Sequence, residues 1–400
     1  MGSPLEQAPY AAMMARELGA VVISVSYRIG PFHQFPAAIH DGEDVLSAIL
    51  DTDGVSKAGK ILRTEINRYY TMMQTTKKKT EAYTGPLDKP NIVLDTTRLS
   101  ISGFSAGGNI ALNMALSVDP CEDILPSSPG PRTSTMNPHH PSQAQLLPPS
   151  RAPTKLDDPS QPWPTILPPP SAQPRLLPLL LFYPSLDARL LPHERPKKPL
   201  PNALNPHDKG KVKPPRPGLF SIMGPTYLPK RLRPHPRASP GLVDPGNIQK
   251  NAAIFLVLPE KDSLAVQSDV WVDKMNSSGW NGPVRFGDGR TGDWDGKGGG
   301  PELTEGHENG GMEVWHAPGC RHGWTQFPSP ALGKHEKSER DFVFARTLEF
   351  VKEKWKGELH VEPVPRVGSL NRKDGGLHTN RQEAGLMPLR IPSHFNGLQE

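Results

Sequence analysis

A short stretch centred on Ser105 constrains this chain more than any other. Residues 99–112 read LSISGFSAGGNIAL: an alternating apolar run, the pattern G-x-S-x-G, and then a helix-like run. In a nucleophile elbow this order forms a sharp strand-to-helix turn, which lifts the serine hydroxyl above the sheet edge at the positive end of the helix. The residues two before and two after the serine crowd each other, and Gly103 and Gly107 are small enough. Taken alone, the pattern also fits an ordinary Gly/Ser turn.

The elements around this stretch predict a parallel sheet covered by helices. Residues 5–18 read as a helix stopped by Gly19, residues 21–27 as a buried β-branched strand, and residues 37–50 as an amphipathic helix. The spacing of strand, loop and helix is typical of βαβ units. Further strands are predicted at 176–183, 253–258 and 312–316, and further helices at 61–73, 107–117, 264–275 and 335–355.

Composition limits how much of the chain enters one core. The 400 residues contain 35% hydrophobic residues, 48 prolines and 37 glycines, so long stretches are unsuited to packing. We predict one α/β domain over 1–355 and a disordered tail over 356–400. The domain is interrupted by a disordered Pro-rich insertion (120–175), a basic loop or cap insertion (190–238) and a Gly-rich acidic loop (281–311).

Charge and cysteine content narrow the classes of partner. The formal net charge is +5, and basic residues gather in 195–237. That segment could bind nucleic acid or a membrane surface, but no aromatic platform accompanies it, so a solvated loop is favoured and no nucleic-acid partner is expected.

Cys121 and Cys320 are expected to be free thiols. No run is long enough for a transmembrane segment. No signal-peptide pattern is visible, which favours a cytoplasmic location.

Two residues further along the chain complete a candidate catalytic set. Ser105, Asp262 and His322 each follow a predicted strand, and the carboxyl ends of parallel strands meet at one edge of a sheet. The order Ser, Asp, His is that of a hydrolase triad: nucleophile, orienting carboxylate and general base.

Each member of this set has an alternative. Asp262 could cap the following helix, and a loop histidine such as His322 is usually just solvated. Glu260 could replace the acid, and His316 or His307 the base. Cys320 and His322 lack two further ligands at zinc spacing, so neither a metal nor a cofactor is expected.

Several motifs resemble the hormone-sensitive-lipase-like esterases, the α/β-hydrolase fold-3 family. Residues 103–109 (GFSAGGN) are similar to the family's G-D-S-A-G-G-N signature. Residues 320–324 (CRHGW) are similar to its H-G-F/W motif. The other matching segments are Y-R-x-x-P…P-A-A…D over 27–41, D-x-x-R at 95–98, S-P at 239–240 and D-x-L at 262–264.

The resemblance implies an α/β-hydrolase fold, a triad of Ser105, Asp262 and His322, an acyl-enzyme intermediate and a small-molecule carboxylic ester as substrate. Phe104 stands where most members have an acidic residue. The family's H-G-G-G oxyanion loop would precede Gly2, and the printed sequence does not contain it. We therefore expect the chain to be N-terminally truncated relative to the family and to lack the first strands of the family's sheet, with the backbone N–H of Ala106 as the remaining oxyanion-hole donor. The alternative function is a catalytically impaired or inactive hydrolase-like protein.

Overall fold

The structure is a computed structural model that describes residues 4–81, 92–121, 160–173, 175–196, 224–280, 284–287 and 310–356. Most of the predicted Pro-rich insertion, much of the basic loop and of the Gly-rich acidic loop, the tail from 357 onward and His307 lie outside the described residues.

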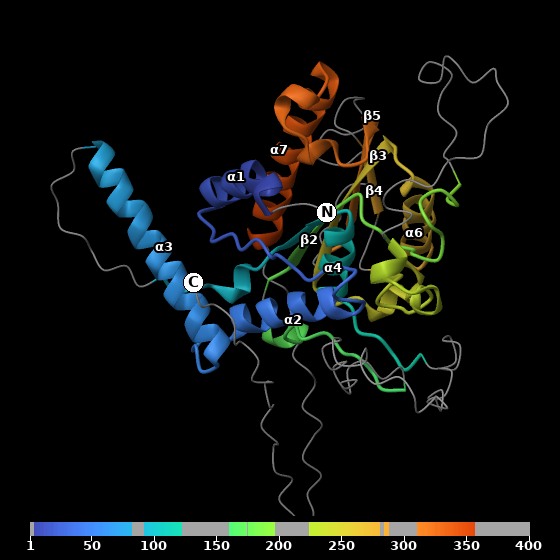
Figure 1. Cartoon of the computed structure of the whole chain (residues 1–400), viewed down its shortest axis with the longest axis horizontal. Coiled ribbons are helices and arrows are strands. Elements are labelled where there is room, and N and C mark those ends of the chain that lie inside the picture. The colour runs from blue at the N-terminus through green and yellow to red at the C-terminus, as the bar shows by residue number, and fades with distance from the viewer. Residues whose placement is uncertain are drawn as a thin grey trace, which may run out of the picture. The chain divides into compact units, whose positions relative to one another are not determined.

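A five-stranded parallel sheet forms the centre of the described fold (Figure 1). Its strands are β1 (Ile101–Phe104), β2 (Leu177–Phe182), β3 (Ala252–Lys261), β4 (Val284–Gly287) and β5 (Met312–Arg321), in the order β1-β2-β3-β5-β4. Four of them confirm strands predicted from sequence. The fifth, β4, lies inside the segment predicted to be a loop, where it pairs with β5.

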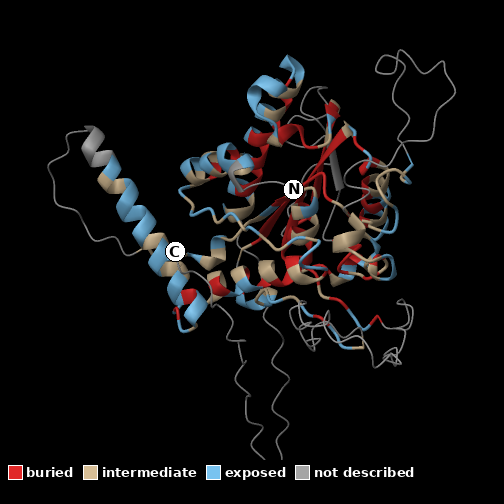
Figure 2. Cartoon of the chain, viewed as in Figure 1, coloured by how far each residue is buried: buried red, intermediate tan, exposed pale blue. Residues whose placement is uncertain are grey.

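Alternation along the strands builds a separate core on each side of the sheet. In β2, Leu179 and Leu181 join one core while Leu180 and Phe182 join the other, as expected when successive side chains point to opposite faces. Helices α2 (Ala37–Leu50), α4 (Ala106–Met114) and α6 (Ala265–Ser277) cover the first core. Helices α1 (Ala8–Leu18) and α7 (Lys334–Lys356) cover the second. Figure 2 shows the strands as the most buried layer. The result is the three-layer α/β arrangement that the sequence predicted.

The prediction of a buried strand at residues 21–27 was wrong. This segment follows α1 without joining the sheet, and Val21 and Val22 are 42% and 40% exposed. Its β-branched residues favour an extended backbone, but a strand also needs a neighbour for its hydrogen bonds. Among the described residues, β1 pairs only with β2 and is an edge strand of the sheet.

The predicted disordered insertion (120–175) wrongly included residues near its C-terminal end. Residues 160–173 are described, and Trp163 within them is buried. Its indole Nε1 donates to Glu43 Oε1 at 2.9 Å, and the Arg237 guanidinium lies 4.3 Å from its ring centre. Trp163 and Val118 also exchange backbone hydrogen bonds. The many prolines of this segment favoured the prediction of disorder, so the packing of Trp163 was not predicted.

Helix α3 (Lys57–Glu81) is longer than the predicted 61–73. It contacts α2 and extends away from the sheet and its other helices (Figure 1). None of the described helices is both long and apolar enough to span a bilayer. Cys121 and Cys320 are buried and do not form a disulfide with each other, as expected.

Candidate active site

Ser105 occupies the strained turn between β1 and α4. Its φ is 56° and its ψ is −116°, a region that residues with a side chain rarely enter. Neighbouring backbone holds it there: the Ser105 N–H donates to the Phe182 carbonyl at 2.9 Å, and the Ser185 N–H donates to the Ser105 carbonyl at 3.3 Å. The turn is therefore fixed from the end of β2.

The two glycines of the elbow have different roles. A Cβ on Gly103 would overlap the carbonyl of Gly107, whereas a Cβ on Gly107 would meet no atom within 4 Å. The backbones of Gly103 and Gly107 are therefore close together, but only Gly103 has no room for a Cβ, and the prediction that both residues must be small was wrong for Gly107. Gly108, which sequence reasoning did not single out, lies close to Pro184: a Cβ there would be 2.9 Å from the proline Cβ.

The structure brings Ser105, His322 and Asp262 into one hydrogen-bonded chain. His322 Nε2 lies 2.9 Å from Ser105 Oγ, and His322 Nδ1 lies 2.8 Å from Asp262 Oδ2. With its proton on Nδ1, the imidazole donates to the carboxylate and accepts from the serine hydroxyl. The Asp262 side chain is 1% exposed and that of His322 is 39% exposed, so the acid is enclosed while the base faces outward.

Strand ends explain this convergence. Ser105 follows β1 directly, Asp262 follows β3 and His322 follows β5, and all three strands run parallel in one sheet. Asp262 also accepts the Leu264 N–H through Oδ1 at 2.9 Å. The turn-forming and histidine-orienting roles of this carboxylate are therefore compatible, one for each oxygen.

Glu260 and His316, the described alternatives for the acid and the base, make other contacts. Glu260 Oε2 accepts the Gly319 N–H at 2.7 Å. His316 Nε2 lies 3.9 Å from Asp269. No group of three or more potential metal ligands occurs among the described residues.

Tyr183 supports the base, and sequence reasoning missed it. Its ring centre is 4.9 Å from that of His322 at an interplanar angle of 65°, and its hydroxyl lies 2.6 Å from Thr325 Oγ1. Burial raises the pKa of the phenol, so the hydroxyl is neutral and can hydrogen-bond. Its φ of 40° is rare for an aromatic residue. A tyrosine at the end of a buried strand carries no catalytic motif, so no sequence signal marked it.

Arg195 brings a positive charge close to the buried acid. Its Nη1 lies 3.4 Å from Oγ of Ser263, the residue after Asp262. Burial lowers the pKa of the Arg195 guanidinium, while the carboxylates of Asp262 and Asp187 act in the opposite direction. The site thus contains a positively charged side chain, Arg195, that is not part of the hydrogen-bonded chain of Ser105, His322 and Asp262.

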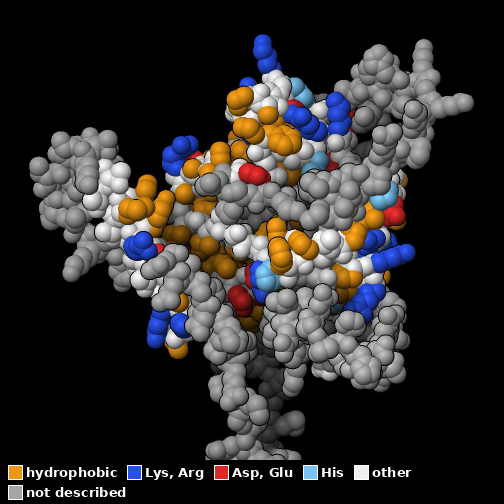
Figure 3. Space-filling view, in the orientation of Figure 1, with side chains coloured by type: hydrophobic (Ala, Val, Ile, Leu, Met, Phe, Trp, Pro, Cys, Tyr) orange, Lys and Arg blue, Asp and Glu red, His pale blue; other side chains and the backbone are white. Residues whose placement is uncertain are grey.

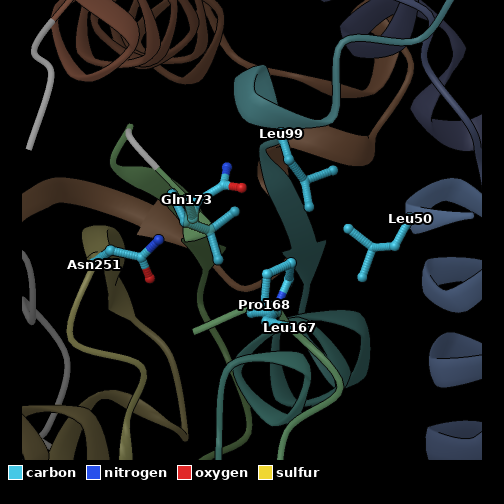
Figure 4. Close-up of a pocket in the computed structure, with 7 residues that line it drawn as sticks. Leu50, Leu99, Leu167, Pro168, Gln173 and Asn251 are labelled. Atoms are coloured by element: carbon cyan, nitrogen blue, oxygen red, sulfur yellow. The ribbon is translucent and has the colours of Figure 1, made fainter. Parts of the chain in front are cut away.

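An apolar pocket lies at the other end of the strands (Figure 4). Leu99 precedes β1, Leu177 begins β2 and Asn251 precedes β3. Ser105, Asp262 and His322 follow the opposite ends of their strands. This pocket is therefore separate from the candidate site.

Ala106 is positioned to donate a hydrogen bond at the site. It is the first residue of α4, so its N–H has no acceptor within the helix. This placement agrees with the oxyanion-hole role predicted for it, which stays a prediction.

A comparison with family models supports the fold. Residues 1–160 match a family described as an alpha/beta hydrolase fold, the α/β-hydrolase fold-3 family. This match covers the motifs at 27–41, 95–98 and 103–109, and it supports the resemblance over that part of the chain. Together with the parallel sheet and the elbow after β1, it identifies the α/β-hydrolase fold.

Comparisons with individual proteins give partial likenesses. Over 118 residues the chain is 31% identical to Carboxylesterase 20 of Arabidopsis thaliana, a segment covering 29% of this chain and 26% of that protein. The chain thus matches about a quarter of the length of this curated relative. A hyperthermophilic esterase of Pyrobaculum calidifontis is 16% identical with a TM-score of 0.43, covering 88% of this chain and 73% of that one. Carboxyl esterase 2 of Tuber melanosporum is 13% identical with a TM-score of 0.45, covering 88% and 75%.

Proposed function

We propose that this protein is a serine hydrolase that cleaves carboxylic esters through an acyl-enzyme intermediate. The observation that carries the proposal is the hydrogen-bonded chain from Ser105 Oγ through His322 to the enclosed Asp262 carboxylate. The choice of esters rests on the motif resemblance, the matched family and the carboxylesterase relative.

In the first half of the reaction, Ser105 Oγ attacks the ester carbonyl carbon while His322 Nε2 takes the hydroxyl proton. The developing imidazolium is stabilised by Asp262, whose Oδ2 already lies 2.8 Å from Nδ1. The Ala106 N–H donates to the oxyanion. His322 then returns the proton to the departing alcohol oxygen, and the acyl group stays on Ser105.

In the second half, a water molecule attacks the acyl-enzyme and His322 takes its proton. The histidine then protonates Ser105 Oγ as the carboxylic acid leaves. The exposed side of His322 is suited to this step, because water must reach Nε2. Asp262 keeps the imidazole in the same tautomer throughout, so both halves use one geometry.

Active-site labelling with a fluorophosphonate tests the nucleophile directly. The full chain is expected to become labelled at Ser105, and Ser105→Ala to remain unlabelled. Ser185→Ala is the matched control, since Ser185 contacts the elbow segment through its backbone: its N–H donates to the Ser105 carbonyl and its carbonyl accepts from Asn109 Nδ2. Labelling that persists in Ser105→Ala would refute the assigned nucleophile.

Hydrolysis of p-nitrophenyl butyrate tests turnover and separates the proposal from its alternative. An active hydrolase releases p-nitrophenol continuously, and Ser105→Ala abolishes the release. Labelling without turnover would identify an impaired hydrolase with an intact nucleophile. Failure of both assays would favour the inactive, hydrolase-like protein.

A further inference from the structure

Helix α3 presents apolar side chains to solvent. Ile61, Tyr69, Met72 and Met73 are 49%, 62%, 53% and 52% exposed. At about 3.6 residues per turn, these four positions fall within an arc of roughly 120° along one side of the helix, and the exposed Glu65 lies within the same arc. We call this side the α3 apolar face. Figure 3 shows hydrophobic side chains gathered part-way along α3.

Polar side chains away from this face connect α3 to the rest of the domain. Arg63 Nη1 donates to the Ala48 carbonyl of α2 at 3.3 Å, and Asn67 Oδ1 accepts the Ile92 N–H at 2.9 Å. Surface helices of globular proteins ordinarily turn their apolar side inward. On α3, Leu62 and Ile66 are partly buried, yet four large apolar side chains remain exposed, and exposed apolar side chains gathered on one side mark an interaction surface.

The charge on α3 indicates what kind of surface it meets. Its sequence contains seven Lys or Arg and two Glu. Lys57 and Lys60 are exposed at its start, and Glu65 is paired with Arg68 at 3.1 Å. Three further lysines, Lys77 to Lys79, follow the apolar stretch in sequence. Cationic residues therefore bracket the α3 apolar face along the chain.

We propose that α3 lies in the headgroup region of an anionic lipid surface and inserts its apolar face. Amphipathic helices rich in Lys and Arg bind such surfaces through apolar burial and charge attraction together. Tyrosine suits this position because its ring is apolar and its hydroxyl stays wet. A second copy of the chain is disfavoured, since pairing would bring two strongly cationic helices side by side.

Co-sedimentation of the full chain with vesicles tests the proposal. Vesicles of phosphatidylcholine alone are compared with vesicles in which a third of the lipid is phosphatidylserine. We expect binding to the anionic vesicles that weakens with added salt. Lys57→Gln should weaken it roughly fivefold, the effect of about 1 kcal/mol per lysine near an anionic surface.

The apolar face is tested by the double variant Tyr69→Glu/Met72→Glu, which should weaken binding to the anionic vesicles more than tenfold. The matched control is Phe342→Glu on α7, where Phe342 is 54% exposed but lies outside α3, and binding should be unchanged. Hydrolysis of a soluble ester by each variant tests the catalytic proposal separately, because none of these residues belongs to the candidate active site.

Three outcomes would overturn the proposal. Vesicle binding that the α3 variants leave unchanged would place the lipid contact elsewhere. Concentration-dependent self-association that Tyr69→Glu/Met72→Glu abolishes would make a second copy the occupant of the face. Absence of both vesicle binding and self-association would mean that neither partner covers it.

Discussion

The hydroxyl of Tyr183 is expected to contribute to catalysis as well as to stability. In Tyr183→Phe the ring next to His322 is kept, but the 2.6 Å hydrogen bond to Thr325 Oγ1 is lost. Both residues are buried, so the Thr325 hydroxyl loses a partner that water cannot easily replace. Leaving such a group unsatisfied destabilises a fold by about 1–3 kcal/mol.

This loss acts on the loop that carries the base. Thr325 lies three residues after His322, in the short 3-10 helix Trp324–Gln326. If about 1.4 kcal/mol of the lost energy bears on the orientation of the imidazole, kcat falls about tenfold. KM should change little, because Tyr183 is fully buried beneath the histidine.

Two measurements on Tyr183→Phe check the prediction: urea denaturation for stability and ester hydrolysis for kcat and KM. Tyr10→Phe is the matched control. Tyr10 is also buried and packs edge-on against Phe182 at 5.6 Å, but it has no ring contact with His322 among those described. Tyr10→Phe removes another buried phenol hydroxyl and should leave kcat unchanged. If Tyr183→Phe lowers stability but leaves kcat unchanged, the positioning argument is refuted.

Three further substitutions test the site and its support. Asp262→Asn should lower kcat by about 10⁴-fold, because the amide favours the wrong imidazole tautomer, while circular dichroism stays native. Gly103→Ala should leave little soluble, folded protein, since the new methyl group overlaps the Gly107 carbonyl; wild-type expression and melting temperature would contradict this. Phe104→Asp, which restores the residue type common in the resembling family, should destabilise the fold by about 2–4 kcal/mol in urea denaturation. It removes a ring stacked 4.3 Å from Phe182 and sets a charge in its place. Unchanged or higher stability would refute that packing argument.

The residues of the candidate site could be predicted because each follows a locally readable pattern. A continuous apolar run precedes Asp262, and a small residue two positions before Ser105 is a steric requirement of its turn. The rule that parallel strands end at one edge then supplies the convergence. None of these steps needs knowledge of a distant contact.

Features that depend on a distant partner could not be predicted in this way. The segment 21–27 has the composition of a buried strand, yet sequence alone does not show whether another strand pairs with it. Trp163 lies in a proline-rich stretch, and its anchoring requires Glu43 from α2 and Arg237 from far along the chain. Local composition indicates which backbone conformation a segment favours. Whether the segment becomes a strand or a packed loop depends on the residues elsewhere in the chain that contact it.

The turn after β2 joins the nucleophile to the base, although its sequence contains no catalytic motif. Through backbone hydrogen bonds to Phe182 and Ser185, it fixes the strained Ser105 from both sides. Between those two residues, the Tyr183 ring meets His322 and its hydroxyl meets Thr325. A shift of this turn would therefore displace Ser105 Oγ and also the His322 ring, which Asp262 holds through Nδ1. Since Asp262 orients only the histidine, the distance between nucleophile and base depends on the turn as much as on the carboxylate.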